Sequence, residues 1–238
     1  MAIKSITYAG IVHEVSYQIE HPKHEEVVLF LHGWGSNKLI MHQAFNGCFS
    51  GYKHLYIDLP GFGDSPNNEV LTSDDYLEIV RLFLRAITLT PKIIIGHSFG
   101  GKLALRLDPE ILILLSSAGI VQPKRTSVKV KIALFKFLKP FGGTKLRQLF
   151  ATKDVEGMAE NMYETLKNVV DEDYTKHFKA YHQKAFIFWG IEDNATPLRS
   201  GEAIHTLIKG SQFFPMSGDH FFFLQHAQEI SKDVLGLA

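Results

Sequence analysis

Short, nearly continuous apolar runs recur along the sequence and predict buried strands. Three of them, at residues 27–33, 54–61 and 92–97, end in glycine or other turn residues. Runs of this kind are typical of central parallel strands that are covered on both faces. Further strand-like runs lie at 111–115, at 185–189 and, in shorter form, at 212–215. In addition, β-formers on both sides of Gly10 predict a hairpin over residues 6–19.

Amphipathic segments alternate with these runs and predict helices. The clearest one spans residues 73–89, where Ser73 is placed to cap the helix, two aspartates follow at its positive end, and five apolar side chains form a stripe. The stripe consists of Tyr76, Ile79, Leu82, Phe83 and Ile87. Helical patterns also occupy residues 199–209 and 221–235. This alternation predicts an α/β fold with a mostly parallel sheet, right-handed crossovers and flanking helices.

Residues 119–181 break the alternation. They contain no strand-like run and have the pattern of several short helices broken at 140–143, so we predict a helical cap inserted over the carboxyl edge of the sheet. The core then comprises residues 1–118 and 182–238. The charge of the cap is uneven, because residues 121–150 hold eight basic side chains and no acidic one. The eight are Lys124, Arg125, Lys129, Lys131, Lys136, Lys139, Lys145 and Arg147.

The composition narrows the functional classes. With 238 residues, 45% of them hydrophobic, the chain is long enough for one domain with a large core. Its 25 basic residues balance 25 acidic ones, so bulk charge does not favour nucleic acid as a partner. No apolar run approaches the roughly 18 residues that a membrane span needs, and the first residues lack an apolar secretory core. A single cysteine, Cys48, fits a reducing compartment, so we expect a cytoplasmic protein.

Residues 96–100 are Gly-His-Ser-Phe-Gly, and their place in the chain predicts a nucleophilic serine. The pattern follows a predicted strand and precedes a helical segment, which is the strand, sharp turn and helix of a nucleophile elbow. Such a turn forces Ser98 into a strained backbone conformation, and the two glycines let strand and helix approach. The Ser98 hydroxyl then stands clear of the sheet at the positive end of the helix. The alternative interpretation is a glycine-rich turn with an incidental serine.

With this motif in place, the sequence resembles the α/β-hydrolase family over nearly its whole length. The family has an oxyanion loop, a nucleophile, an acid and a histidine in that order. The matching segments are HGWGS at 32–36, DLPGFGDS at 58–65, WGIEDNATP at 189–197 and SGDHFFFL at 217–224. The resemblance implies Asp193 as the acid, His220 as the base, and an oxyanion hole made by the backbone N–H groups of Trp34 and Phe99. This agrees with the chemistry, since serine needs a base that an anion holds in one tautomer.

Other residues compete for two of these roles. Glu192 and Asp219 stand beside the implied acid and base, and only the register of the motif favours the acid chosen above. Of twelve histidines, only His220 lies in a short turn between a late strand-like run and the last helix. His32 and His97 flank the predicted site, and we expect them to make structural hydrogen bonds.

Motifs for a metal or a nucleotide are missing from the sequence. It has no HExxH, no pair of cysteines, no EF-hand loop, no P-loop and no GxGxxG, so we expect neither a metal nor a cofactor. Asp58 and Asp64 are explained by turn chemistry. Because the predicted nucleophile is serine and not aspartate, the sequence argues against haloalkane dehalogenases and epoxide hydrolases, and we predict acyl transfer to water.

Several apolar residues are candidates for an acyl pocket, although each of them fits the core equally well. They are Trp34, Phe99, Ile120, Met162 and Phe221. The leading hypothesis is a hydrolase of carboxylic esters with a small or medium acyl group. Its loop at 32–35 resembles that of pimeloyl-acyl-carrier-protein methyl ester esterases, and the basic cap would suit an acidic carrier protein. A basic run of this kind is, however, usually a solvated helical face.

Two other functions stay open. Meta-cleavage-product hydrolases cleave carbon–carbon bonds and share the fold and the order of the three residues. They commonly have asparagine before the serine and tryptophan soon after the histidine, where this sequence has His97 and three phenylalanines at 221–223. The other alternative is a ligand receptor without catalysis, against which the intact set of Ser98, Asp193 and His220 argues.

Overall fold

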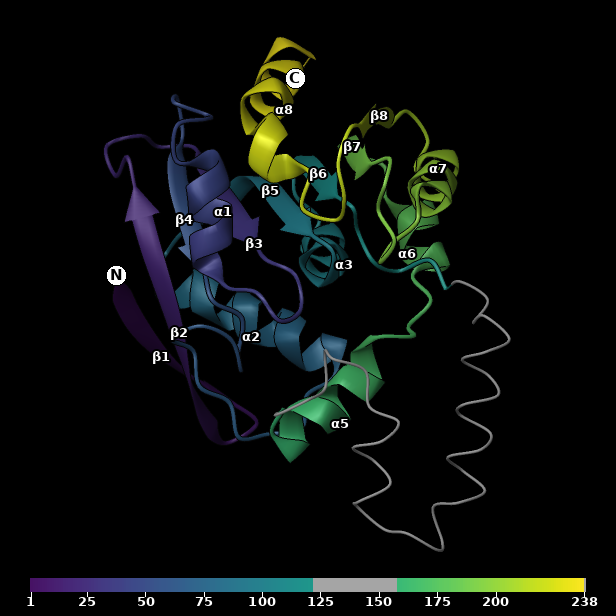
Figure 1. Cartoon of the computed structure of the whole chain (residues 1–238). Helices are drawn as coiled ribbons and strands as arrows, with labels where there is room; N and C mark the ends of the chain where they lie inside the picture. Colours follow the sequence, from purple (N-terminus) through teal and green to yellow (C-terminus); the bar gives the residue numbers. More distant parts are fainter. Residues whose placement is uncertain (122–157, 238) are drawn as a thin grey trace, which may run out of the picture.

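An eight-stranded sheet runs through the molecule in the order β1-β2-β4-β3-β5-β6-β7-β8 (Figure 1). The computed structural model describes residues 1–121 and 158–237. The strands are β1 (Ala2–Tyr8), β2 (Ile11–Glu20), β3 (Val27–Leu31), β4 (Lys53–Ile57), β5 (Pro91–His97), β6 (Ile111–Leu115), β7 (Lys184–Gly190) and β8 (Gln212–Met216). β1 and β2 form an antiparallel hairpin that joins β4, and all pairs from β4 to β8 are parallel. The prediction of a mostly parallel α/β sheet is confirmed.

Helices cover both faces of this sheet (Figure 1). One face carries α1 (Lys38–Phe45) and α8 (Phe223–Leu237), and the other carries α2 (Ser73–Ala86), α3 (Phe99–Arg106) and α7 (Leu198–Leu207). β3 illustrates the consequence for the sequence, because all five of its residues are buried. Val28 and Phe30 join the core under α1 and α8, while Leu29 and Leu31 join the opposite core. A strand with two covered faces has no polar alternation, which explains the continuous apolar runs.

The ends of α2 and α8 differ from the prediction. α2 is capped by Thr72, which forms a capping box with Asp75, so the expectation that Ser73 caps this helix is wrong. The Ser73 hydroxyl donates instead to Glu172. α2 ends at Ala86, shortly before the positive φ of 56° at Thr88. α8 begins at 223 because residues 219–222 form a turn before it.

Between β6 and β7 the described residues form two helices, α5 (Glu160–Val169) and α6 (Thr175–Ala180), and no strand. Three polar side chains of α5 bind the backbone of the loop before α2. Asn161 donates to the carbonyl of residue 67 (2.9 Å), Thr165 accepts from the N–H of residue 71 (2.9 Å), and Asn168 donates to the carbonyl of residue 71 (3.2 Å). These hydrogen bonds attach α5 to the loop before α2 and so to the core.

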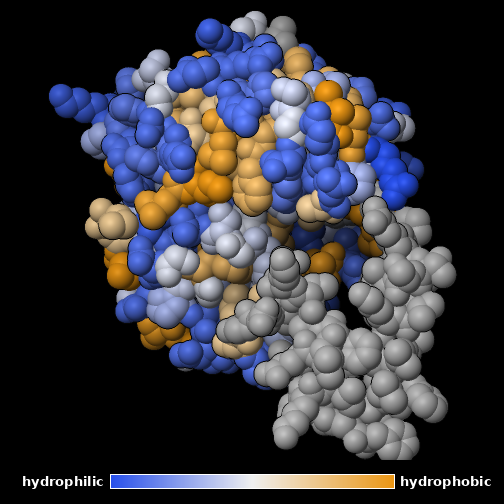
Figure 2. Space-filling view, viewed as in Figure 1, coloured by the Kyte–Doolittle hydropathy of each residue, from blue (hydrophilic) through white to orange (hydrophobic). Residues whose placement is uncertain are grey.

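The boundaries predicted for the core and the cap stay a prediction. The eight basic residues between 124 and 147, and the break at 140–143, lie outside the described residues. On the face shown in Figure 2, hydrophobic surface forms bands between larger hydrophilic areas. Within the described ranges, no helix is both long enough and apolar enough to cross a membrane.

Candidate active site

Ser98 occupies the turn between β5 and α3, at the carboxyl edge of the sheet. Its φ of 50° and ψ of −113° lie in a region that residues with a side chain rarely adopt. Backbone hydrogen bonds hold the turn. The Ser98 N–H donates to Leu115 O, and the Ser98 carbonyl accepts from Gly101 and Ala118, all at 3.0 Å. The result is a sharp, strained connection between strand and helix with a partly exposed serine at its apex.

Two glycines make this turn sterically possible. A Cβ on Gly96 would lie 2.5 Å from the carbonyl oxygen of Gly100, and a Cβ on Gly100 would lie 2.5 Å from the carbonyl oxygen of Leu31. Both distances are well below any normal contact of a side chain with backbone. The close approach of β3, β5 and α3 therefore requires glycine at both positions.

His220 and Asp193 form a hydrogen-bonded pair beyond the ends of β8 and β7. His220 Nδ1 lies 2.7 Å from Asp193 Oδ2, and the carboxylate is buried. Burial by itself would raise the pKa of Asp193, but His220 and the donors of Thr196 outweigh it and lower that pKa to about 2. The ionised carboxylate holds the ring proton of His220 on Nδ1, and Nε2 is then the atom that can accept a proton.

The two rival acids take other positions. The Glu192 carboxylate accepts a hydrogen bond from the N–H of Gly218, and Asp219 accepts from the N–H of Phe221 at 2.8 Å. In the part of the chain that the structure describes, neither carboxylate has a hydrogen bond with the imidazole of His220. Both acids bind the backbone of the loop that carries His220. Among the described residues, the carboxylate that binds the imidazole of His220 is that of Asp193.

Thr196 is a member of the site that the sequence analysis missed. Its hydroxyl lies 2.8 Å from Asp193 Oδ2 and 3.0 Å from the carbonyl oxygen of Ser116, and its backbone N–H donates to Asp193 Oδ1 at 2.9 Å. Ala195 N–H donates to the same Oδ1 at 2.8 Å. An aspartate whose side chain accepts from backbone N–H groups two and three residues on forms an Asx-type turn. The segment DNATP carried that signal.

The loop of residues 32–36 passes directly beside Ser98. A Cβ on Gly33 would lie 3.1 Å from Ser98 Cβ. The backbone N–H groups of Trp34 and Phe99, which the resemblance implies as oxyanion donors, have no backbone hydrogen-bond partner among the described residues. Phe99 is also the first residue of α3, where the helix dipole favours negative charge. Two available donors beside a serine are the arrangement that stabilises an oxyanion.

Aromatic side chains surround the turn. Trp34 packs edge-on against Phe62 (4.9 Å between ring centroids) and against Phe99 (5.9 Å). Phe62 belongs to the loop after β4 and was not among the predicted pocket residues. Phe221, whose side chain is 38% exposed, lies 5.5 Å from the ring of His220. The surroundings of the serine are therefore apolar on the sides of both the oxyanion loop and the base.

The remaining predicted pocket residues lie in different surroundings. Ile120 is half-buried and packs against the core under α2 and α3. Met162 of α5 lies against Gly61, where an added Cβ would approach its sulfur to 2.4 Å, and 3.6 Å from Asn67 Nδ2. Met162 thus anchors α5 to the loop after β4, and its role in an acyl pocket stays a prediction.

The imidazole of His220 contacts His97, the residue that precedes Ser98. His97 Nε2 donates to the carbonyl oxygen of His220 at 2.9 Å, and the two rings lie 4.6 Å apart. Within the described ranges no hydrogen bond joins the Ser98 hydroxyl to His220. His220 is thus hydrogen-bonded to Asp193, and its ring lies against the ring of His97. Hydrogen bonds between a nucleophile and its base often tighten only when substrate binds.

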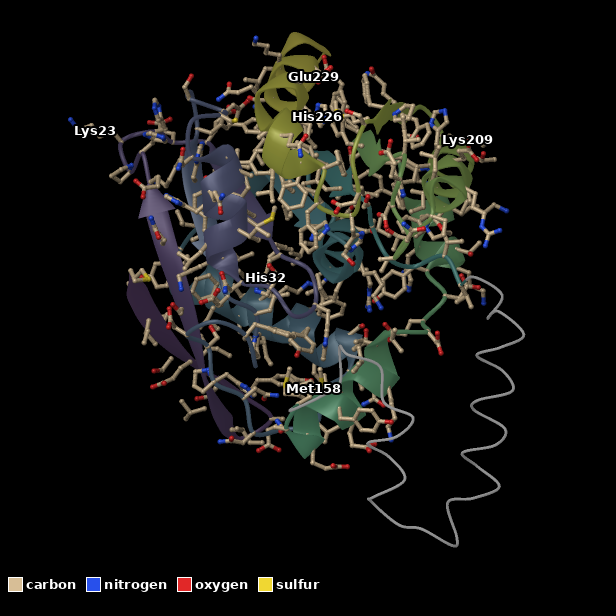
Figure 3. The ribbon with its side chains drawn as sticks, viewed as in Figure 1. Lys23, His32, Met158, Lys209, His226 and Glu229 are labelled. Carbon is tan, nitrogen blue, oxygen red and sulfur yellow. The ribbon has the colours of Figure 1, made fainter. Side chains whose placement is uncertain are left out.

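His32 and Asp58 have structural hydrogen bonds. His32 lies buried in the middle of the molecule (Figure 3), where Nδ1 donates to the carbonyl of the next residue (2.8 Å) and Nε2 accepts from the N–H of Leu59 (3.0 Å). Asp58 and Asp64 both accept from the ammonium group of Lys38, at 2.6 and 2.8 Å. Across residues 1–121 and 158–237, no three His, Cys, Asp or Glu side chains are grouped so that they could hold a metal ion.

Comparison with known proteins identifies the family of the chain. The family model described as "Alpha/beta hydrolase family" matches residues 28–232. The AB hydrolase superfamily protein YisY of Bacillus subtilis is 25% identical over 257 aligned positions, which cover 94% of this chain and 96% of that protein. An esterase from Exiguobacterium antarcticum has a TM-score of 0.74 at 21% identity, over 94% of this chain and 95% of that one. A meta-cleavage product hydrolase from Pseudomonas fluorescens has a TM-score of 0.72 at 18% identity, over 98% and 96%. At these identities the two structures establish likeness of fold alone.

Proposed function

Because the chain belongs to the alpha/beta hydrolase family, we propose that it is a serine hydrolase that cleaves a carboxylic ester through an acyl-enzyme on Ser98. One observation carries the proposal: the 2.7 Å hydrogen bond between His220 and a buried, ionised Asp193, beside the strained turn of Ser98. A base held in one tautomer near a partly exposed serine is the arrangement that makes serine nucleophilic.

The first half of the reaction forms the acyl-enzyme. His220 Nε2 takes the proton of Ser98 Oγ while that oxygen bonds to the carbonyl carbon of the ester. The carbonyl oxygen becomes an oxyanion, which the N–H groups of Trp34 and Phe99 stabilise. When the tetrahedral intermediate collapses, the bond to the alcohol oxygen breaks and the alcohol leaves with the proton from His220.

The second half releases the acid. His220 removes a proton from water as the water oxygen attacks the acyl carbon, and the second oxyanion occupies the same donors. Collapse of this intermediate breaks the bond to Ser98, which takes the proton back from His220. Asp193 stays ionised throughout and stabilises the imidazolium that forms twice in each cycle. The net reaction consumes one ester and one water and yields one acid and one alcohol.

The surroundings of Ser98 favour an apolar acyl group of small or medium size. The rings of Trp34, Phe62 and Phe99 lie together beside the serine turn, and Phe221 lies next to His220. Apolar walls with a few placed polar groups are typical of sites for alkyl or aryl ligands. The methyl ester of an acyl group on an acidic carrier protein is the finer proposal. It depends on the eight basic residues between 124 and 147, which lie outside the described residues.

Labelling with a fluorophosphonate probe tests the nucleophile. We expect one label on the wild type, at Ser98. Ser98→Ala should not be labelled, should lose at least about 10³-fold in turnover of a p-nitrophenyl ester, and should keep its melting temperature. Wild-type turnover by Ser98→Ala would show that another residue is the nucleophile. A wild type that is never labelled would favour a ligand-binding protein on this scaffold.

A substrate panel tests the ester. Turnover of p-nitrophenyl esters of increasing chain length should exceed turnover of a dienoate ketone. The reverse order would show that the enzyme cleaves a carbon–carbon bond and not an ester. A carrier-bound ester then tests the finer proposal. Its turnover should fall with added salt while that of the free ester does not, since docking of opposite charges is screened. An equal response of the two esters would contradict a docking role for the basic residues.

A further inference from the structure

Among the described residues, the imidazole of His97 makes one hydrogen bond, and that bond is to the main chain of the proposed base. The residue is 1% exposed, its Nε2 lies 2.9 Å from the carbonyl oxygen of His220, and the two rings lie 4.6 Å apart. Burial first, and the proximity of His220 second, lower the pKa of His97 to about 3, so its ring is neutral at working pH. A neutral imidazole has one N–H, and the carbonyl oxygen of His220 requires that it be on Nε2.

The other ring nitrogen of His97 has no partner. Nδ1 is buried and makes no hydrogen bond with any described residue. It faces the oxyanion loop, since a Cβ on Gly33 would lie 2.8 Å from it. A buried acceptor without a donor lowers stability. The rings of Phe221 and Phe223 lie 5.2 and 4.8 Å from the imidazole, so an apolar ring would suit these surroundings without that loss.

We propose that His97 is a positioning residue, whose Nε2–H holds the main chain of His220 and thereby sets the distance between the imidazole of His220 and the hydroxyl of Ser98. The inference rests on the proposed serine hydrolase. His220 is then held at two points, at Nδ1 by Asp193 from the end of β7 and at its carbonyl by His97 from the end of β5. Because His97 and Ser98 are consecutive, one turn carries both the proposed nucleophile and the side chain that binds the main chain of its base.

Residue chemistry supplies a matched set of variants. The amide nitrogen of glutamine matches the position of Nε2 in histidine, whereas that of asparagine matches Nδ1. His97→Gln therefore keeps a donor within reach of the His220 carbonyl, His97→Asn places it too far back, and His97→Phe removes it while keeping a ring. A loss of positioning without a loss of binding should change kcat and leave KM nearly constant.

We expect kcat on a p-nitrophenyl ester to fall about 10- to 100-fold in His97→Phe and His97→Asn, with KM within about twofold. His97→Gln should stay within about fivefold of the wild type. The rate of fluorophosphonate labelling should follow kcat through the series, because it reports the reactivity of Ser98 directly. His97→Phe should melt no lower than His97→Gln, since it removes the unpartnered nitrogen.

Two results would overturn the inference. One is wild-type kcat in His97→Phe or His97→Asn. The other is a loss of kcat in His97→Gln as large as in the other two, because that would make the residue a packing element only. Failure of the proposed function has a different signature, since the wild type itself would then not be labelled by the fluorophosphonate.

Discussion

The backbone conformation of Ser98 is unfavourable for a residue with a side chain and is held by hydrogen bonds to neighbouring residues. A residue with a side chain at φ of 50° and ψ of −113° costs about 1 to 3 kcal/mol. Ser116, at the end of the adjacent strand β6, has a φ of 43° and presents its carbonyl to the hydroxyl of Thr196. Strain is thus stored at two neighbouring strand ends, each linked to one part of the proposed triad.

Removing the space that this turn needs should damage both stability and activity. In Gly100→Ala the new Cβ would lie 2.5 Å from the carbonyl oxygen of Leu31, and backbone atoms cannot move aside cheaply. Although alanine favours helix by about 1 kcal/mol, we expect a net loss of about 2 kcal/mol from overpacking. The melting temperature should fall by about 4 to 8 °C, and turnover of a p-nitrophenyl ester should fall at least about 10-fold.

Gly51→Ala is the matched control for this substitution. A Cβ on Gly51 would have no heavy atom within 4 Å, so both measurements should stay near the wild-type values. If Gly100→Ala instead behaved like Gly51→Ala, the turn at Ser98 would have space for a side chain at residue 100. Close packing at Gly100 would then not explain the position of Ser98.

The sequence was sufficient for the residues whose roles follow from local order, and insufficient for contacts across the chain. The strained turn at Ser98 was predictable because strand, turn and glycines are consecutive, while the pairing of Asp193 with His220 was implied by the resemblance to the family. The bond from His97 to the carbonyl of His220 spans 123 positions and ends on main chain. No residue type or spacing marks such a contact, because every residue has a carbonyl.

The elements were predictable to the extent that burial sets their composition. Strands covered on both faces are apolar almost throughout, so the five parallel strands from β3 to β7 were visible in the sequence, whereas the edge strand β8 is only partly buried and gave a shorter run. α1 was not predicted. Its eight residues bury only three side chains, Lys38, Met41 and Phe45, and one of these is a charged residue held by carboxylates from the loop after β4. A helix whose buried face includes an ion pair lacks the apolar stripe from which helices are predicted.

The segment with α5 and α6 is held to the core by a buried cation as well as by the polar face of α5. Lys102 of α3 is 1% exposed and donates to the carbonyl of Val169 and to Glu172, both at 2.6 Å. The ring of Tyr174 lies 4.8 Å from its ammonium group. Burial lowers the pKa of Lys102, and Glu172 opposes this change. The pair connects the helix that follows Ser98 to the segment between β6 and β7.

The two partners of this pair should not be equivalent to mutation. Glu172→Gln would leave the buried ammonium group of Lys102 without its counter-charge, and we expect a loss of about 2 to 3 kcal/mol in the free energy of unfolding. Lys102→Met would leave Glu172, which is 30% exposed and can be hydrated, so its loss should stay within about 1 kcal/mol. Urea unfolding of both variants measures this difference. A larger loss in Lys102→Met than in Glu172→Gln would show that the lysine acts mainly through its hydrogen bond to Val169.

At the scale of the whole molecule, buried histidines connect the site to the stability of the fold. His32 and His97 lie beside Ser98 at the edge of the sheet, and burial, the largest cause in each case, lowers their pKa values from 6.5 to about 4 and about 3. Burial also lowers the pKa of His54 and of His13. Each of the four therefore binds a proton less readily in the folded protein than in the unfolded chain, so the unfolded chain binds more protons than the native one as the pH falls below about 6.5.

The free energy of unfolding should therefore fall when the pH is lowered from 7 to 5. For a histidine whose folded pKa lies below its unfolded value of 6.5, the contribution to stability is complete above that value and is lost as the pH falls toward the folded pKa. At pH 5 this amounts to about 2 kcal/mol for each of His32 and His97. Asp193 adds a second, separate loss of stability, because its folded pKa of about 2 lies below the unfolded value of 3.8 and its contribution disappears only below about pH 4.

Urea unfolding at pH 7, 6 and 5 measures the loss of stability that the histidines cause. His97→Phe should reduce the decrease in the free energy of unfolding between pH 7 and pH 5 by about 2 kcal/mol. A wild type with equal stability at pH 7 and pH 5 would mean that these imidazoles are protonated as readily in the folded protein as in the unfolded chain, and His97 could then not act as a neutral donor to His220.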